Sequence, residues 1–278
     1  MKTVPAVRLG PRKSLGQNFL RDDNIARKIV AAIDPQQEDC VLEIGPGEGA
    51  LTRHLAGRCR TLTVVDVDQR VVSAMNAMFS DGSVEVILGD FLATDLQAFA
   101  CTHPGRFRVV GNIPYYITSP ILFHVLDNRA PVCDLTITVQ KEVGRRMLAT
   151  PGTGDYGILS VFCGYYAEVR ALFEISPSAF FPKPAVTSLV MQLKFRLRPV
   201  HPARDEKFFR EMVRSTFGKR RKTLRNSLRY FAAPRGITLP DLPLLERRPE
   251  ELSLPELVEL SNVLLERAPA RGAEPDRT

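Results

Sequence analysis

A glycine-rich loop is the first place in this sequence where residue types and spacing indicate ligand binding. Residues 43–49 read EIGPGEG and stand between a predicted strand and a predicted helix. Glycines there let the backbone turn tightly and approach a ligand closely, beside the positive end of the helix. The dinucleotide fingerprint GxGxxG has its third glycine one residue later. The GxGxG spacing that begins at Gly45 therefore predicts a nucleotide site of another type.

Acidic residues follow the next two predicted strands. Asp66 comes directly after one of them, and Asp90 follows the other after a glycine. We expect both carboxylates to face the Gly45 loop, because ligands bind at the carboxyl edge of an open parallel sheet. Asp66 could accept hydrogen bonds from both hydroxyls of a ribose, and Asp90 could accept one from the amino group of an adenine. Each acid alone could instead cap a helix, but together with Glu43 they favour a nucleoside site.

The Gly45 loop also resembles the S-adenosylmethionine loop of class I methyltransferases, and the motif Asn112-Ile113-Pro114-Tyr115 after the fourth predicted strand could serve methyl transfer. An adenine N6 is a poor nucleophile because its lone pair is delocalised into the ring. The Asn112 carbonyl and a backbone carbonyl, accepting the two N6 hydrogens, would favour a pyramidal nitrogen aimed at the methyl group. Pro114 would fix the loop, and Tyr115 would offer a face for stacking. The alternative is an ordinary Asn-x-Pro turn beside a packed tyrosine.

Strands that alternate with helices are predicted through the first two-thirds of the chain. This alternation predicts βαβ units and a doubly wound, mostly parallel sheet. The last two strands are joined by a short loop only, so we expect them to pair antiparallel at one edge. The predicted strands are residues 40–44, 61–65, 84–88, 108–111, 135–139, 169–175 and 189–195, and the predicted helices are residues 25–33, 51–57, 71–79, 120–126 and 142–148.

Beyond a linker at 196–203 with two prolines, the sequence pattern is helical only. Helices are predicted over 205–217, 219–231 and 255–266, the last with Pro255 at its start and Ser253 as its cap. The small, polar segment 268–278 is predicted to be disordered. The expected organisation is an α/β domain over residues 1–198 and a small all-α domain over 199–267.

Positive charge is concentrated in the predicted helical domain. The chain has a formal net charge of +7, and residues 201–230 alone hold ten Lys or Arg against three Asp or Glu. A concentrated basic surface suggests a polyanionic partner, because binding to phosphates releases counterions. The alternative is that these charges form a solvated helix face without a partner. The candidate RNA-binding residues crowd the start of one predicted helix and are Lys219, Arg220, Arg221, Lys222 and Arg225.

Cysteine and histidine positions indicate neither a disulfide framework nor a metal site. The five cysteines include no CxxC pair, and the four histidines have no metal-like spacing. No stretch approaches the length needed to span a membrane. We therefore expect a cytoplasmic protein without metal or membrane partner. We also expect a monomer.

Six segments, in order along the chain, resemble the motifs of the ribosomal RNA adenine dimethyltransferase family. The resemblance implies a class I methyltransferase fold with S-adenosylmethionine as cofactor. It also implies, as substrate, two adjacent adenosines in the 3′-terminal helix loop of 16S rRNA within the small ribosomal subunit, four methylations in all. The segments are residues 13–20 (KSLGQNFL), 43–49, 112–115, 140–143 (QKEV), 156–160 (YGxLS) and 180–188 (FFPKPAVTS), which fits an FxPxPxVxS pattern.

The resemblance also assigns roles to single residues. Phe180 would close on the target base opposite Tyr115, so that Asn112, Pro114, Tyr115 and Phe180 form the catalytic set. Two positions depart from the family: Asp66 stands where Glu is usual, and Thr187 where Asp is expected. The implied cofactor contacts are Asn18, Leu20, Gly45, Asp66, Asp90 and Asn112.

Two other functions fit the same motifs. A relative that methylates one adenosine of large-subunit RNA and confers antibiotic resistance shares every catalytic motif. A non-catalytic protein of the same fold could instead bind nucleic acid or assist ribosome assembly. The intact Gly45 loop and Asn112 favour catalysis over pure binding.

Overall fold

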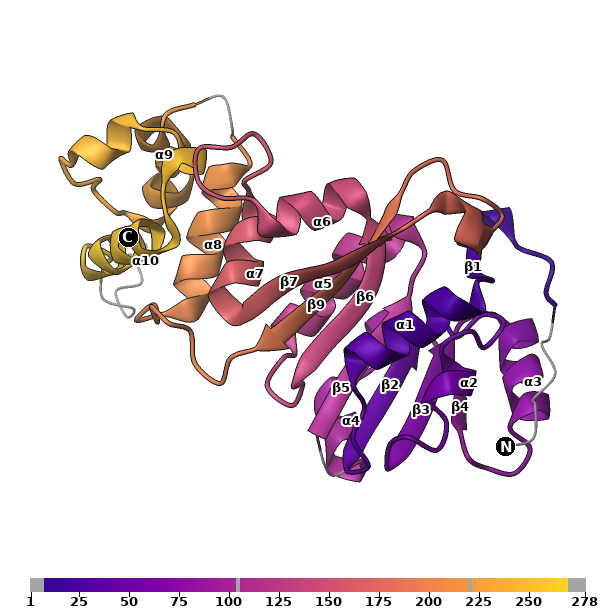
Figure 1. Cartoon of the computed structure of the whole chain (residues 1–278). Helices are drawn as coiled ribbons and strands as arrows, with labels where there is room; N and C mark the ends of the chain where they lie inside the picture. The colour runs from indigo at the N-terminus through magenta and orange to yellow at the C-terminus, as the bar shows by residue number, and fades with distance from the viewer. Residues whose placement is uncertain (1–7, 104–105, 220–221, 270–278) are drawn as a thin grey trace. The chain divides into compact units, whose positions relative to one another are not determined.

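The computed structural model describes residues 8–103, 106–219 and 222–269, which form two compact units (Figure 1). The first unit holds the described residues up to Gly144 together with Ala167–Leu197. The second holds Arg145–Tyr166 and the described residues from Arg198 onward. The division predicted at residue 198 instead assigns 145–166 to the first domain, so the two divisions differ there. The tail predicted to be disordered lies outside the described residues except for Ala268 and Pro269.

A seven-stranded sheet forms the centre of the first unit. Its order is β4-β3-β2-β5-β6-β9-β7. The first five strands run parallel, whereas β9 is antiparallel to both of its neighbours. The predicted antiparallel edge hairpin is therefore confirmed. The strands are β2 (Asp39–Ile44), β3 (Thr61–Asp66), β4 (Glu85–Leu88), β5 (Arg106–Asn112), β6 (Asp134–Gln140), β7 (Ala167–Ile175) and β9 (Ser188–Phe195).

Helices alternate with the parallel strands, and each helix has one buried side. Every residue of β2 is buried, as expected for a parallel strand whose two faces are both covered. Buried side chains of α1 and α3 share one apolar cluster with Val41 and Val64 of the sheet. All five helices predicted between the strands are present. The structure also has α4, which was not predicted. The helices are α1 (Asp23–Ile33), α2 (Thr52–Leu55), α3 (Gln69–Met78), α4 (Leu96–Thr102), α5 (Thr118–Asp127) and α6 (Lys141–Leu148).

A second, two-stranded sheet joins the segment before α1 to the loop before β9. Its strands are β1 (Phe19–Leu20) and β8 (Phe180–Phe181), which pair antiparallel. Phe19 lies opposite Phe181, and Leu20 lies opposite Phe180. Two segments that are far apart in the sequence are thereby held beside the sheet's carboxyl edge.

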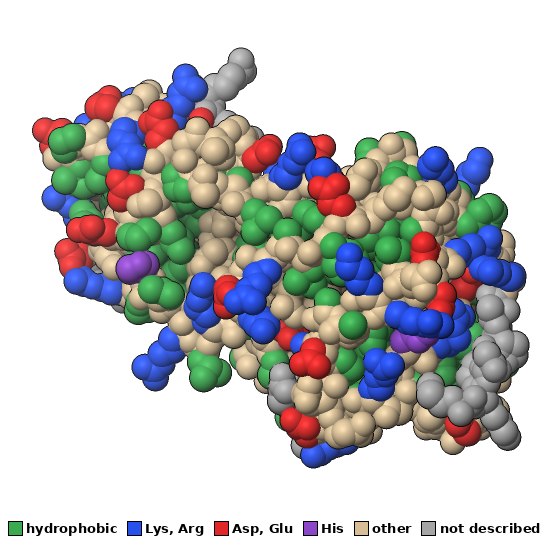
Figure 2. All heavy atoms as spheres, in the orientation of Figure 1, with side chains coloured by type: hydrophobic (Ala, Val, Ile, Leu, Met, Phe, Trp, Pro, Cys, Tyr) green, Lys and Arg blue, Asp and Glu red, His purple; other side chains and the backbone are tan. Residues whose placement is uncertain are grey.

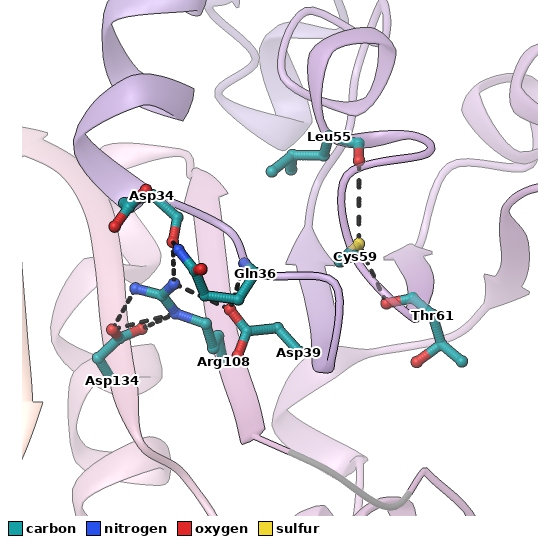
Figure 3. Close-up of polar contacts among 8 residues, drawn as sticks. All are labelled: Asp34, Gln36, Asp39, Leu55, Cys59, Thr61, Arg108 and Asp134. Atoms are coloured by element: carbon teal, nitrogen blue, oxygen red, sulfur yellow. Dashed lines mark hydrogen bonds and ion pairs between the residues drawn. The ribbon is translucent and has the colours of Figure 1, made fainter.

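A buried ion cluster lies at the amino-terminal ends of the parallel strands (Figure 3). The Arg108 guanidinium donates to Asp134 with Nε–Oδ1 and Nη2–Oδ2 distances of 3.0 and 2.5 Å. Its Nη1 donates to Asp39 Oδ2 at 3.1 Å and to the Asp34 carbonyl at 3.0 Å. This arginine connects β5 with β6 and β2 and leaves the opposite, carboxyl edge to the candidate site.

The second unit is helical and packs around aromatic side chains. Tyr165, Phe209 and Phe231 are almost completely buried. Ser253 caps the last helix as predicted, since its Oγ accepts from the Glu256 N–H. The helices are α7 (Ile158–Tyr166), α8 (Glu206–Phe217), α9 (Leu224–Ala232) and α10 (Leu254–Glu266).

The helix predicted over 219–231 begins later than expected. Thr223 is the cap of α9, and its Oγ1 accepts from the Asn226 N–H at 3.4 Å. A threonine at this position satisfies an otherwise free N–H group and so favours the helix start there. Lys219 and Lys222 consequently precede the helix. No helix in the described part of the chain is long and apolar enough to cross a membrane.

Candidate functional site

A cleft opens at the carboxyl ends of β2, β3, β4 and β5. From β2 the chain proceeds to β3 and β4 on one side and then returns to β5 on the other. Ligands bind at such a switch point in open α/β sheets. The cleft has an empty volume of about 890 Å³, with its opening to solvent included. All six predicted cofactor residues line it: Asn18, Leu20, Gly45, Asp66, Asp90 and Asn112.

The glycine loop forms the floor of this cleft with backbone rather than side chains. Gly45 and Gly47 have φ angles of 63° and 56°, a region that other residues rarely adopt. A Cβ on Gly47 would lie 2.8 Å from Cδ1 of Phe19, so the close approach of the two segments also requires glycine there. The acid before the loop is buried: Glu43 accepts from Thr52 Oγ1 at 2.8 Å, and burial raises its pKa to about 7. Glu43 thus connects β2 to the first residue of α2.

The two other acids occupy different environments. Asp66 is the last residue of β3, and its Oδ1 accepts from the Asp68 N–H at 2.8 Å. Burial, and then the neighbouring Asp68 charge, raise the pKa of Asp66 to about 6. Asp90 is exposed, stands two residues beyond the end of β4, and accepts from the Leu92 N–H at 2.9 Å. Asp90 therefore caps a short 3₁₀ helix and also lines the cleft.

Asn112 ends β5 with its side chain held in one direction. Its Nδ2 donates to the Asn18 carbonyl at 3.1 Å, which leaves Oδ1 as the acceptor of this amide. Pro114 also lines the cleft. The arrangement suits a side chain that must present a carbonyl oxygen to a hydrogen-bond donor.

Neither predicted stacking residue belongs to the cleft lining. Tyr115 is partly buried, and its hydroxyl lies 2.5 Å from Ser188 Oγ. Phe180 is only 5% exposed and packs in the apolar cluster with Leu20. Tyr116 does line the cleft and is 61% exposed. The base-stacking roles of Tyr115 and Phe180 remain predictions.

Two acids that sequence reasoning did not select fasten the segment before α1 beside the cleft. Glu48, 4% exposed, accepts from the Leu9 N–H at 2.9 Å and from Arg21 Nη2 at 2.8 Å. Asp68 accepts from Gln17 Nε2 at 3.1 Å. The only local signal was a charged residue inside the glycine loop, because the partners Leu9, Gln17 and Arg21 are 27 to 51 residues away from these acids.

The basic run is less uniform than its sequence suggests. Arg220 and Arg221 lie outside the described residues. Arg225, within this run, forms ion pairs with acidic side chains. Its guanidinium lies 2.6 Å from Glu246 Oε1 and 3.3 Å from Asp241 Oδ1, carboxylates that a later segment brings to α9. Acidic and basic side chains also intermingle over the surface visible in Figure 2.

Over residues 9–241 the chain matches the sequence model of a family described as "Ribosomal RNA adenine dimethylase". "Ribosomal RNA small subunit methyltransferase A" of Moorella thermoacetica is 40% identical across 95% of this chain and 96% of that protein. The protein of the same name from Pseudomonas aeruginosa is also 40% identical, across 92% and 95% of the two chains.

Two solved structures are similar over most of their length. A dimethyladenosine transferase from Plasmodium falciparum has a TM-score of 0.72 at 24% identity and covers 89% of this chain and 96% of that one. The 23S rRNA methyltransferase ErmE has a TM-score of 0.64 at 29% identity and covers 88% and 99%. The predicted class I methyltransferase fold is thereby confirmed.

Proposed function

Because the chain belongs to the ribosomal RNA adenine dimethylase family, we propose that it methylates N6 of two adjacent adenosines in the 3′-terminal helix loop of 16S rRNA. Each adenosine receives two methyl groups, and the enzyme acts during maturation of the small ribosomal subunit. The observation that carries this assignment is 40% identity to small-subunit methyltransferases over nearly their full length. The likeness to ErmE, at 29% identity, is what favours large-subunit RNA as a second candidate.

Members of this family and fold are methyltransferases, and the cleft fits S-adenosylmethionine. The positive-φ glycines at 45 and 47 keep side chains away from a ligand. Asp66 would hold the ribose hydroxyls, and Asp90 would face the adenine amino group. A carboxylate destabilised by burial gains most from such donors, which suits Asp66. When bound, the cofactor supplies an electrophilic sulfonium methyl group.

Asn112 positions the target nitrogen in this proposal. Its Oδ1 and a backbone carbonyl of the same loop accept the two N6 hydrogens, and the nitrogen lone pair then points at the methyl group. The hydrogen bond from Nδ2 to Asn18 fixes the amide in the required orientation. The rate gain therefore comes from positioning and preorganised dipoles.

An Asn112→Ala enzyme separates catalysis from mere binding. The turnover number should fall by about 100-fold or more, because the interaction is strongest in the transition state. Affinity for small subunits should change less than about threefold. The readouts are single-turnover methyl transfer and subunit binding by filter retention. Equal losses in both quantities would indicate a structural role for Asn112.

The proposal also covers the residues that contact the RNA and the location of the enzyme. Lys219 and Lys222, with Arg220 and Arg221 between them, would contact rRNA phosphates without reading sequence. Arg225 contributes less, since Glu246 and Asp241 already neutralise it. The enzyme would work as a cytoplasmic monomer.

A further inference from the structure

A surface pocket in the second unit is lined in part by an exposed tyrosine. Three of its lining residues, Asn226, Arg229 and Tyr230, are spaced by three and four positions along α9 and so share one face of the helix, next to the cap Thr223 and the preceding Lys222. Tyr230 is 53% exposed, so its ring is accessible to a partner. None of the lining residues is acidic. They are Lys222, Thr223, Asn226, Arg229 and Tyr230.

Two lysine ammonium groups lie over this ring. Lys222 Nζ donates to the Tyr230 hydroxyl at 2.8 Å and lies 4.9 Å from the ring centroid. Lys219 Nζ lies 5.0 Å from the same centroid. The hydrogen bond from Lys222, with its charge, lowers the pKa of Tyr230. In contrast to Arg225, neither lysine forms an ion pair with a described carboxylate.

We propose that this pocket, here called the Tyr230 pocket, binds an unpaired nucleotide of ribosomal RNA. The base stacks on the Tyr230 ring, while Lys219, Lys222 and Arg229 hold the flanking phosphates. The Asn226 amide can both donate to and accept from a base edge. This inference rests on the proposed function, because that function brings RNA to the second unit.

The exposed ring and the cations together favour an unpaired nucleotide over phosphate alone or a duplex. An exposed aromatic ring among cations is the arrangement with which proteins hold single-stranded nucleic acid. A site for phosphate alone gains nothing from an exposed ring. A duplex would present phosphates to the lysines but no free base face to Tyr230.

The test uses the full-length protein and an oligouridylate of about ten nucleotides that carries one 2-aminopurine. Tyr230→Ala should weaken binding about 5- to 150-fold with an unchanged salt slope, since stacking carries no charge. Tyr230→Phe should bind nearly as the wild type does. Lys222→Gln should lower the salt slope by about one unit. Val200→Ala, at another exposed apolar side chain of this unit, is the control.

Three results would overturn the proposal. Tyr230→Ala could bind the oligonucleotide as tightly as the wild type, Tyr230→Phe could lose as much as Tyr230→Ala, or tripolyphosphate could bind as tightly as the oligonucleotide. Methyl transfer to rRNA, measured on the same preparations, keeps the two ideas separate. Wild-type protein that methylates rRNA while Tyr230→Ala binds normally contradicts the pocket alone. Wild-type protein that methylates no rRNA contradicts the proposed function, whatever the oligonucleotide does.

Discussion

At the scale of single residues, the proposed ribose contact of Asp66 should make ligand binding depend on pH. Its pKa is raised from 3.8 to about 6, chiefly by burial. The folded protein therefore holds a proton more tightly than the unfolded chain between about pH 4 and 6, and folding stability falls as the pH rises through this window. Donation from two ribose hydroxyls favours the ionised carboxylate, so cofactor binding should offset this loss.

We accordingly expect affinity for S-adenosylhomocysteine to fall as the pH drops below about 6. Asp66→Asn should bind more weakly, by about 1–3 kcal/mol at neutral pH, and should lose this pH dependence. Glu43 titrates nearby with a pKa of about 7, so Glu43→Gln is the control. Glu43→Gln should keep the pH-dependent affinity that Asp66→Asn loses, because the raised pKa of Asp66 comes chiefly from its own burial. Calorimetric titration from pH 5 to 8 measures this, and an unaltered profile in Asp66→Asn would contradict the ribose contact.

At the scale of elements, removal of the arginine from the Arg108 cluster should destabilise the parallel sheet. Arg108 is 3% exposed and faces two buried carboxylates from neighbouring strands. Arg108→Met leaves both carboxylates without their main partner, and should lower the free energy of unfolding by about 3–5 kcal/mol. Arg170→Met, which breaks an exposed pair with Glu168, should cost less than about 1 kcal/mol.

Urea denaturation of the two variants measures the difference. The expected result is a clearly lower midpoint for Arg108→Met, at a similar slope, and a nearly unchanged midpoint for Arg170→Met. Equal midpoints for the two variants would mean that the buried charges are solvated or compensated in some other way.

Strand positions could be predicted from sequence because each buried strand is a short apolar run bounded by polar residues. The pairing of β1 with β8 could not. Each strand has two residues only, and they pair across roughly 160 residues of chain. The start of α9 was misplaced for a local reason, since residues 219–222 have good helix propensity but Thr223 provides the cap.

At the scale of the whole molecule, the part of the candidate site that could be predicted is the part whose position follows from the order of the parallel strands. Asp66, Asp90 and Asn112 belong to one cleft because successive parallel strands end at one edge. Long-range partners were not predictable. The carboxylates that neutralise Arg225 and the packing that buries Phe180 depend on segments distant in sequence, and no local pattern records them.

The central claim is the identity of the methylated nucleotides, and product mapping tests it most directly. Methyl transfer from labelled S-adenosylmethionine is measured on small and large subunits that lack their methyl groups, with Asn112→Ala as the inactive control. The account predicts label on two adjacent adenosines near the 3′ end of 16S rRNA, approaching two methyl groups on each, and none on the large subunit. Label on a single adenosine of 23S rRNA, or no transfer to either subunit, would contradict it.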